Sequence, residues 1–357
     1  MRQESFDFLK NLVESPSPSG FEAPAVRVYR EYVQSYAEEV TVDVMGNVSA
    51  ILSGGNAGPR IMLCGHCDEI GFMVQYIDDQ GFLYFSAIGG IDAHLIPGHR
   101  VRIHTSQGSI LGVIGKKPIH LMEDEERKKI AKITDLYIDI GARDKKEAEE
   151  VILIGDPVTM DVGLENLRNG LICSRALDDK VGSFVVAETL RLLKEEGKPF
   201  CGQLISVATV QEEVGLRGAT TSAYQHRPDI GIAVDVGFST DQPGIEKKKV
   251  GDFALGKGPM ITRGANINPI VFDLLVRAAR EKEISFQIEG VPRSTGTDAN
   301  VIQLARGGVA TGLVSIPCRY MHTPVEVVSL QDLENTARLL AAFIRNLSAE
   351  ISFIPAK

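Results

Sequence analysis

Four short apolar runs in the chain each lead to acidic or histidine residues. They span residues 61–64, 204–210, 230–234 and 313–316. Continuous apolar runs of this kind are typical of strands that are buried on both faces of a largely parallel sheet. In such open α/β sheets, ligands bind beyond the carboxyl ends of the strands. The polar residues that follow the runs are therefore expected to meet at one rim of the sheet.

The polar residues at this predicted rim are imidazoles and carboxylates. They are His66 and Asp68 after the first run, Glu212 and Glu213 after the second, Asp235 after the third, His322 a short loop beyond the fourth, and Asp178 just before the helical pattern of 181–196. So many carboxylates at one sheet edge would repel one another strongly without compensating cations. Two divalent metal ions would supply that charge.

The types of side chain limit which metals the site would suit and which reaction it could carry out. Imidazole mixed with carboxylate suits zinc, cobalt or manganese, whereas a structural zinc site favours four closed ligands, often cysteines. The spacing of His66 and Asp68 lets the carboxylate accept a hydrogen bond from the second ring nitrogen. Of the adjacent Glu212 and Glu213, one can bind metal while the other takes a proton from a metal-activated water. This division of roles indicates hydrolysis.

Residues 64–67 read Cys-Gly-His-Cys, which is also the tetrapeptide of disulfide isomerases. A reactive pair of this kind places its first thiolate at a helix N-terminus, where nearby cations lower its pKa. Here Asp68 and Glu69 follow, and residues 71–77 have the pattern of a strand. Because the acidic charges oppose a thiolate, Cys64 and Cys67 are expected to pack around His66 rather than to carry redox chemistry.

The charge of the chain argues against nucleic acid and membranes as partners. The chain has 47 acidic and 38 basic residues, a net charge of -9, and neither a basic tract nor a long apolar run. Its N-terminal residues, MRQESFDFLK, lack the apolar core of a secretory signal. Five cysteines, an odd number spread along the chain, indicate a reducing compartment. We therefore expect a cytoplasmic protein.

The pattern of the chain changes twice, which indicates an α/β domain interrupted by a β-rich insertion. Strand-like runs separated by Gly, Asp or Gln turns fill about 71–160, as in a small β-barrel or sandwich. The α/β pattern returns after about residue 171, with an amphipathic helix predicted at 181–196. A capping box of Ser329 and Asp332 predicts the start of the last helix, and apolar residues follow it at spacings of three and four.

These motifs resemble a known family, the tetrahedral metallo-aminopeptidases, which are also called glutamyl aminopeptidases and, by an older label, endoglucanases. The matching motifs are PSPSGFE, GHCDEIGF, RALDDKVG, VQEEVGLRGA, AVDVG, STGTDA and RYMHTPVE, in the order of the family through nearly the whole chain. The resemblance implies a zinc-peptidase-like mixed sheet flanked by helices, interrupted by an inserted small β-barrel. It implies a catalytic domain of 1–69 and 164–357, a dimerisation domain of 70–163, and a hollow homododecamer built from dimers.

The resemblance also implies a role for each residue at the rim. His66, Asp178 and Asp235 would hold one divalent metal ion, and Asp178, Glu213 and His322 would hold the other, with Asp178 as the bridge. Glu212 would be the general base and Asp68 the carboxylate behind His66. Of the adjacent Asp178 and Asp179, the first is assigned because related sequences place other residues at the second. Zinc or cobalt is the expected metal, with manganese as a third option, and peptides are the expected substrates.

Other functions and preferences remain open alternatives. An endoglucanase would need two carboxyl groups across a sugar, and this chain has no Trp and 6% aromatic residues for stacking on sugars. A related dinuclear deacylase or carboxypeptidase, and a non-catalytic metal-stabilised scaffold, are the further alternatives. Arg263, Arg293 and Arg319 could line a pocket for acidic side chains, but the sequence does not choose between acidic, aliphatic and basic preferences. The histidines of the insertion, His94, His99, His104 and His120, are expected to be surface or interface residues.

Overall fold

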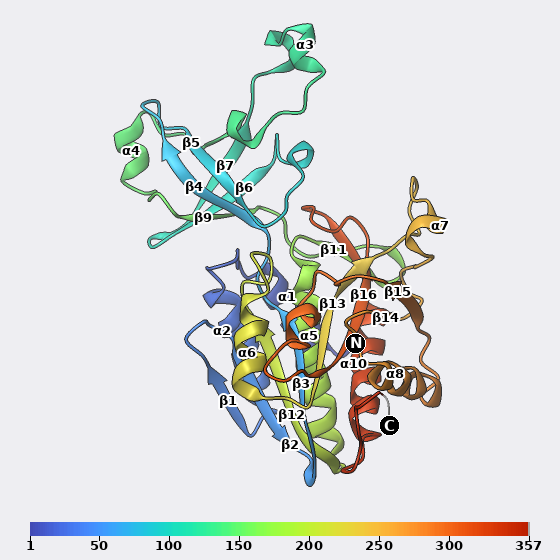
Figure 1. Ribbon diagram of the computed structural model, residues 1–357. Coiled ribbons are helices and arrows are strands. Elements are labelled where there is room, and N and C mark those ends of the chain that lie inside the picture. The colour runs from blue at the N-terminus through green and yellow to red at the C-terminus, as the bar shows by residue number, and fades with distance from the viewer. Residues whose placement is uncertain (356–357) are drawn as a thin grey trace.

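The computed structural model describes residues 1–355, apart from the side chain of Asn56. It consists of a large mixed β-sheet with helices packed around it and a closed barrel of six strands that stands at one end of the molecule (Figure 1). This architecture confirms the predicted α/β fold with an inserted barrel. Within the described residues, no helix is long and apolar enough to cross a bilayer.

The large sheet has eight strands in the order β1-β2-β12-β3-β13-β16-β14-β15. Their bounds are Glu39–Val42, Val48–Ser53, Phe200–Thr209, Gly55–His66, Ile230–Phe238, Ala310–Cys318, Met260–Gly264 and Gln287–Val291 in that order. The four central strands, β12, β3, β13 and β16, run parallel to one another. Their carboxyl ends therefore lie at the same edge, as the apolar runs predicted. A small sheet of β10 (Glu165–Asn166), β11 (Leu171–Ser174) and β17 (Glu326–Ser329) lies close to that edge.

Helices cover the large sheet. They are α1 (Gln3–Glu14), α2 (Ala23–Val33), α5 (Leu177–Glu196), α6 (Arg217–His226), α7 (Lys247–Val250), α8 (Pro269–Glu281), α9 (Ala299–Ile302) and α10 (Leu330–Arg345). The prediction that residues 181–196 form an amphipathic helix is wrong in one respect, because α5 is buried almost all round. It contacts β3, β12 and β13 and also α1, α2 and α10, so no broad face is left for solvent.

A close approach of backbones holds α5 against the strand that carries His66. A Cβ atom at Gly65 would lie 2.3 Å from the backbone carbon of Gly182. Such a distance is far too short for two carbon atoms, so a side chain at position 65 would force the helix away from the strand. Glycine at this position therefore lets the start of α5, with its two aspartates, lie beside the end of β3.

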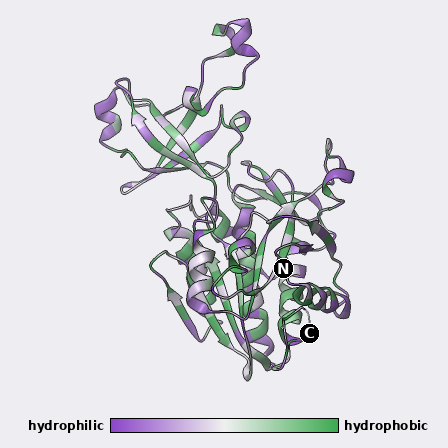
Figure 2. Ribbon diagram, viewed as in Figure 1, coloured by the Kyte–Doolittle hydropathy of each residue, from purple (hydrophilic) through white to green (hydrophobic). Residues whose placement is uncertain are grey.

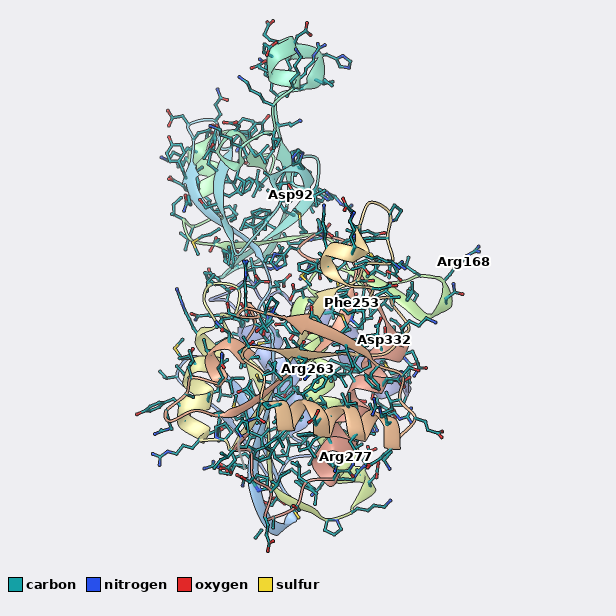
Figure 3. The ribbon with its side chains drawn as sticks, turned by 45° about the vertical axis from the view of Figure 1, so that its right-hand side comes forward. Asp92, Arg168, Phe253, Arg263, Arg277 and Asp332 are labelled. Carbon is teal, nitrogen blue, oxygen red and sulfur yellow. The ribbon has the colours of Figure 1, made fainter. Side chains whose placement is uncertain are left out.

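The capping box predicted for the last helix does not form. Ser329 is the N-cap of α10, but its side chain makes no capping hydrogen bond. Asp332 instead accepts hydrogen bonds from the backbone nitrogens of Gly256 and Gly258, at 2.7 and 2.8 Å (Figure 3). The apolar spacing of the helix is confirmed, since Leu333, Ala337, Leu340 and Ile344 are all buried. A carboxylate can serve a distant loop as readily as its own helix, and local sequence does not distinguish the two.

The barrel is built from the stretch that the sequence marked as β-rich. Its strands are β4 (Gly71–Ile77), β5 (Leu83–Ile88), β6 (Arg100–Thr105), β7 (Gly108–Gly115), β8 (Tyr137–Asp139) and β9 (Pro157–Met160). They enclose an apolar core of their own, separate from that of the large sheet. Two charged stretches of the insertion form short helices: α3 (Asp124–Arg127) lies at the tip of an arm that projects from the barrel, and α4 (Lys145–Glu149) lies beside the barrel strands (Figure 1). Both helices are hydrophilic (Figure 2).

Candidate active site

The polar residues of the predicted rim converge on one cavity of about 540 Å³ at the carboxyl ends of the parallel strands. His66 is the last residue of β3, Asp235 lies within β13, and Asp178 lies at the start of α5. Glu212 and Glu213 follow β12, and His322 follows β16 (Figure 1). These six residues all line the cavity. The structure thus brings together the residues that the sequence scattered over more than 250 positions.

Asp178 lies between the two imidazoles. Its Oδ1 atom is 3.2 Å from His66 Nε2, and its Oδ2 atom is 3.2 Å from His322 Nε2. Glu213 Oε1 is 3.5 Å from His322 Nε2, while Glu212 Oε2 and Asp235 Oδ1 are 3.8 and 4.0 Å from His66 Nε2. One carboxylate therefore faces both halves of the cluster, each of which has its own histidine.

Three groups of donor atoms lie within 4.8 Å of one another and could each hold a cation. They are Asp178, Glu213 and His322; His66, Asp179 and Asp235; and His66, Glu212 and Glu213. The first group has the same members as the second metal set that the family resemblance implies. The second group contains Asp179 where the resemblance implies Asp178.

Asp179 has other partners for its carboxylate. Its Oδ2 atom accepts a hydrogen bond from the backbone nitrogen of His66 at 3.1 Å, and Oδ1 accepts one from Gly182 at 3.0 Å. The carboxylate of Asp178 instead faces the two imidazoles. The hydrogen bonds of Asp179 tie β3 to α5, and they favour Asp178 as the residue whose carboxylate is directed to the centre of the cluster.

The cluster contains more negative charge than its own histidines balance. Burial raises the pKa of Glu212 to about 10 and that of Glu213 to about 7, and neighbouring carboxylates add to both shifts. Burial also raises the pKa of Asp235 well above its ordinary value. Divalent cations would favour the ionised form of all these groups, and imidazole with carboxylate is a donor set that suits such ions. The residues present therefore fit a metal centre.

Asp68 is buried behind the cluster and makes more contacts than predicted. The ring nitrogen Nδ1 of His66 forms its hydrogen bond with the backbone carbonyl of Asp68 at 3.1 Å, while the Asp68 carboxylate is 3.5 Å away. That carboxylate accepts hydrogen bonds from the backbone nitrogens of Glu212 and Glu213, at 3.0 and 3.2 Å, and from Ser19 Oγ at 2.7 Å. Asp68 therefore positions both the histidine and the pair of glutamates.

Glu326 is a residue of this site that sequence reasoning missed. Its Oε2 atom accepts a hydrogen bond from the backbone nitrogen of Asp178 at 3.0 Å, and its Oε1 atom accepts one from His322 at 2.9 Å. The ring of His322 is held from the other side, because its Nδ1 atom lies 2.8 Å from the carbonyl oxygen of Gly90. Glu326 ends the motif RYMHTPVE, so the motif contained it, but nothing in the local pattern indicated its partners.

The cysteines of the Cys-Gly-His-Cys stretch are buried. Cys64 and Cys67 are both fully inaccessible, and both are free thiols. Burial raises the pKa of each thiol well above its ordinary value, and nearby aspartates add to the shift. A thiol with a raised pKa and no access to solvent is a packing residue rather than a redox centre.

The three arginines considered for substrate binding lie elsewhere. Arg319 pairs with Asp241 at 2.7 Å, and Arg263 stacks over Phe272 with 5.6 Å between its guanidinium carbon and the ring centre. Arg293 is exposed. Neither Lys nor Arg occurs among the described residues that line the cavity.

Comparison with known proteins identifies the family. The sequence-family model of the M42 glutamyl aminopeptidases matches residues 46–339 of this chain. The lysyl aminopeptidase of Pyrococcus furiosus is 37% identical over 346 residues, which cover 96% of this chain and 97% of that protein. The TET aminopeptidase of a marine sediment archaeon, Thaumarchaeota archaeon SCGC AB-539-E09, has a TM-score of 0.93 at 36% identity and covers 98% of both chains. The TET1 peptidase of Pyrococcus horikoshii has a TM-score of 0.85 at 31% identity and covers 96% of this chain and 100% of that one.

These similarities extend over the whole α/β sheet and the barrel, and they include every segment that contributes to the cavity. They confirm the prediction of an aminopeptidase over the alternatives of an endoglucanase, a deacylase or carboxypeptidase, and a scaffold. The chain belongs to the M42 glutamyl aminopeptidase family and is a hydrolase of peptide bonds.

Proposed function

We propose that the chain removes N-terminal residues from peptides at the cavity described above, with Glu212 as the general base. The observation that carries the proposal is the position of Asp178 between His66 and His322, at 3.2 Å from each. A carboxylate shared by two imidazoles, with further carboxylates beside each, is the arrangement expected of a dinuclear metal centre.

Membership in a metallopeptidase family implies divalent metal cofactors. We assign one ion to His66, Asp178 and Asp235 and the other to Asp178, Glu213 and His322, with zinc or cobalt as the metal and manganese as the third candidate. Metal ions bound there would polarise the scissile carbonyl group and lower the pKa of a water molecule.

Glu212 is suited to move the proton of the attacking water. Its side chain is buried at the wall of the cavity, and its backbone nitrogen is held by the Asp68 carboxylate at 3.0 Å. A general base in this position accepts a proton from the water and returns it to the leaving amine. Asp68 and Glu326 have no place in the proton transfer, and their role is to hold the backbones of the residues that line the cavity.

The barrel is proposed to be the dimerisation domain, with 70–163 as its extent and 1–69 plus 164–357 as the catalytic domain. Its separate core and its exposed apolar side chains Tyr76, Leu111 and Val113 support an assembly role. The relative from Pyrococcus horikoshii is described as assembling into a tetrahedron or a large octahedral shell. We propose a homododecamer built from dimers, located in the cytoplasm.

The function is tested by removing bound metal with a chelator and restoring zinc, cobalt or manganese separately. The substrates are a peptide with a free N-terminus and the same peptide with an acetylated N-terminus. An aminopeptidase should lose activity with the metal, recover it on addition of one of the ions, and cleave only the free peptide. Equal cleavage of both peptides would overturn the assignment as an aminopeptidase, and full activity without metal would overturn the dinuclear mechanism.

A further inference from the structure

The cavity contains an acidic residue that does not belong to the metal cluster. Glu289 lines the cavity but occurs in none of the three groups of donor atoms. It lies on β15, where residues two apart share a face. Val291 also lines the cavity, Gly290 between them has no side chain, and Ile288, one residue before Glu289, is not among the lining residues and is 51% exposed. The strand therefore directs one carboxylate and one apolar side chain into the cavity.

Glu289 is held in place by its neighbouring strand. It is opposite Thr262 in the register of β14 and β15, and Thr262 Oγ1 donates a hydrogen bond of 2.9 Å to Glu289 Oε2. Thr262 is fully buried, so this contact does not compete with solvent. The hydrogen bond fixes one oxygen of the carboxylate and leaves the other available.

Glu289 has no cationic partner in the described part of the chain. No Lys, Arg or His nitrogen lies within 4.0 Å of its carboxylate, and no described residue donates a hydrogen bond to Oε1. Burial raises the pKa of Glu289, and the hydrogen bond from Thr262 opposes this shift. A half-buried carboxylate without a cation is unfavourable unless a ligand supplies the charge.

We propose that Glu289 determines specificity by binding the side chain of a basic N-terminal residue, lysine or arginine. This inference rests on the proposed function of the cavity as the aminopeptidase site. Apolar side chains at the cavity wall, among them Leu313 and Met321, would contact the alkyl part of such a residue, while its cationic end reaches Glu289. An acidic side chain would meet a like charge, and an aliphatic one would leave Glu289 without a partner.

The test compares lysine with norleucine, which has the same chain length but lacks the ammonium group. We would measure kcat/KM for the p-nitroanilides of lysine, norleucine and glutamate with the wild-type metal-loaded protein, Glu289→Gln and Glu31→Gln. Glu31 is an exposed glutamate on α2 without a hydrogen bond or ion pair in the described structure, so it controls for the change in net charge. We expect the wild type to prefer lysine over norleucine by at least roughly tenfold, the worth of a partly buried charge pair.

Glu289→Gln should abolish most of that preference and leave the value for norleucine within about twofold, whereas Glu31→Gln should change neither. An equal loss for lysine and norleucine would overturn the proposal, because Glu289 would then bind the α-amino group that both share. A wild type that does not prefer lysine would also overturn it, even if Glu289→Gln failed to fold. If no substrate with a free N-terminus were cleaved, the proposed function itself would fail, which is a separate result.

Discussion

The backbone nitrogen of Glu212 donates a hydrogen bond of 3.0 Å to the carboxylate of Asp68. This contact joins the loop after β12 to the end of β3, two segments that are 144 residues apart. The same carboxylate accepts a hydrogen bond from Glu213 and another from Ser19. The proposed base and its neighbour are thus positioned from behind by a residue that does not line the cavity.

Glu212 and Glu213 should respond differently to the same substitution. Glu213→Gln removes the charge of a proposed metal ligand, so both metal content and rate should fall. Glu212→Gln keeps the size of the side chain but cannot accept a proton, so turnover should fall by ~10² to 10⁴ with metal content near that of the wild type. Metal analysis and steady-state kinetics decide the matter, and equal metal loss in both variants, or an active Glu212→Gln protein, would refute the assignment.

Asp68→Asn should lower metal affinity and turnover, although Asp68 does not line the cavity. The variant keeps the shape of the side chain but loses the charge and presents an NH₂ group to backbone donors. Substitutions behind metal ligands typically cost about 10- to 100-fold in metal affinity or activity. Ser19→Ala removes only the hydroxyl that contacts Asp68 and should cost less. Metal titration monitored by activity would rank the two variants, and an Asp68→Asn protein with unchanged affinity and rate would contradict the positioning role.

Cys64 and Cys67 should be dispensable for chemistry. Both are buried and free. Replacing both with alanine should leave turnover within about a few fold, with some loss of stability because packing contacts are removed. Kinetics alongside thermal unfolding would separate the two effects. Complete loss of hydrolysis in a folded, metal-loaded double variant would mean that the thiols participate in the reaction.

Glu69→Gln should destabilise the fold strongly. The carboxylate of Glu69 is 2% exposed and pairs with Lys180 Nζ at 2.9 Å and with the guanidinium of Arg175. Removing it leaves two buried cations without their partner, which typically costs about 3–5 kcal/mol. The exposed pair of Lys117 and Glu126 is the matched control, and Glu126→Gln should leave stability unchanged. Denaturant unfolding of both variants gives the comparison, and similar midpoints would argue against a structural role for the buried network.

The ion pair of Asp241 and Arg319 should make part of the stability depend on pH. Although burial acts to raise it, hydrogen bonds from Arg319 and Ser239 lower the pKa of Asp241 from 3.8 to about 2. Since the folded protein binds this proton less tightly than the unfolded chain, the stabilisation is complete above about pH 4 and is lost as the pH falls toward 2.

Asp241→Asn measures this contribution. The difference in unfolding free energy between wild type and variant should be constant from pH 6 to about 5 and should decrease below about pH 4. Urea unfolding at several pH values would show it. A difference that stays constant down to pH 3 would mean that the pair does not stabilise the folded state.

The central sheet and most of the cluster could be predicted from local patterns in the sequence. The runs before His66, Glu212, Asp235 and His322 are apolar enough to be buried strands, and parallel strands place their carboxyl ends together. The family motifs then indicated the aminopeptidase function, which the comparisons confirm. The short strand-like runs of the insertion likewise predicted a small β-barrel or sandwich, because turn residues and strand patterns are local properties of the chain, and the structure shows the barrel.

Contacts between groups that are distant in the chain depend on strand pairing and packing, which the sequence pattern does not reveal. Glu326 reaches Asp178 because β17 pairs with β11, and Glu289 enters the cavity because β15 pairs with β14. The Asp332 carboxylate accepts a hydrogen bond from the loop of Gly256 instead of capping its own helix. Helix α5 is buried even on faces where its sequence has polar residues. In each case the contact that stabilises the residue is made with a partner far away in sequence, so no local pattern specifies it. The sequence shows only that a residue is Asp or Glu; it does not show whether the carboxylate caps a helix, binds a loop or binds a substrate.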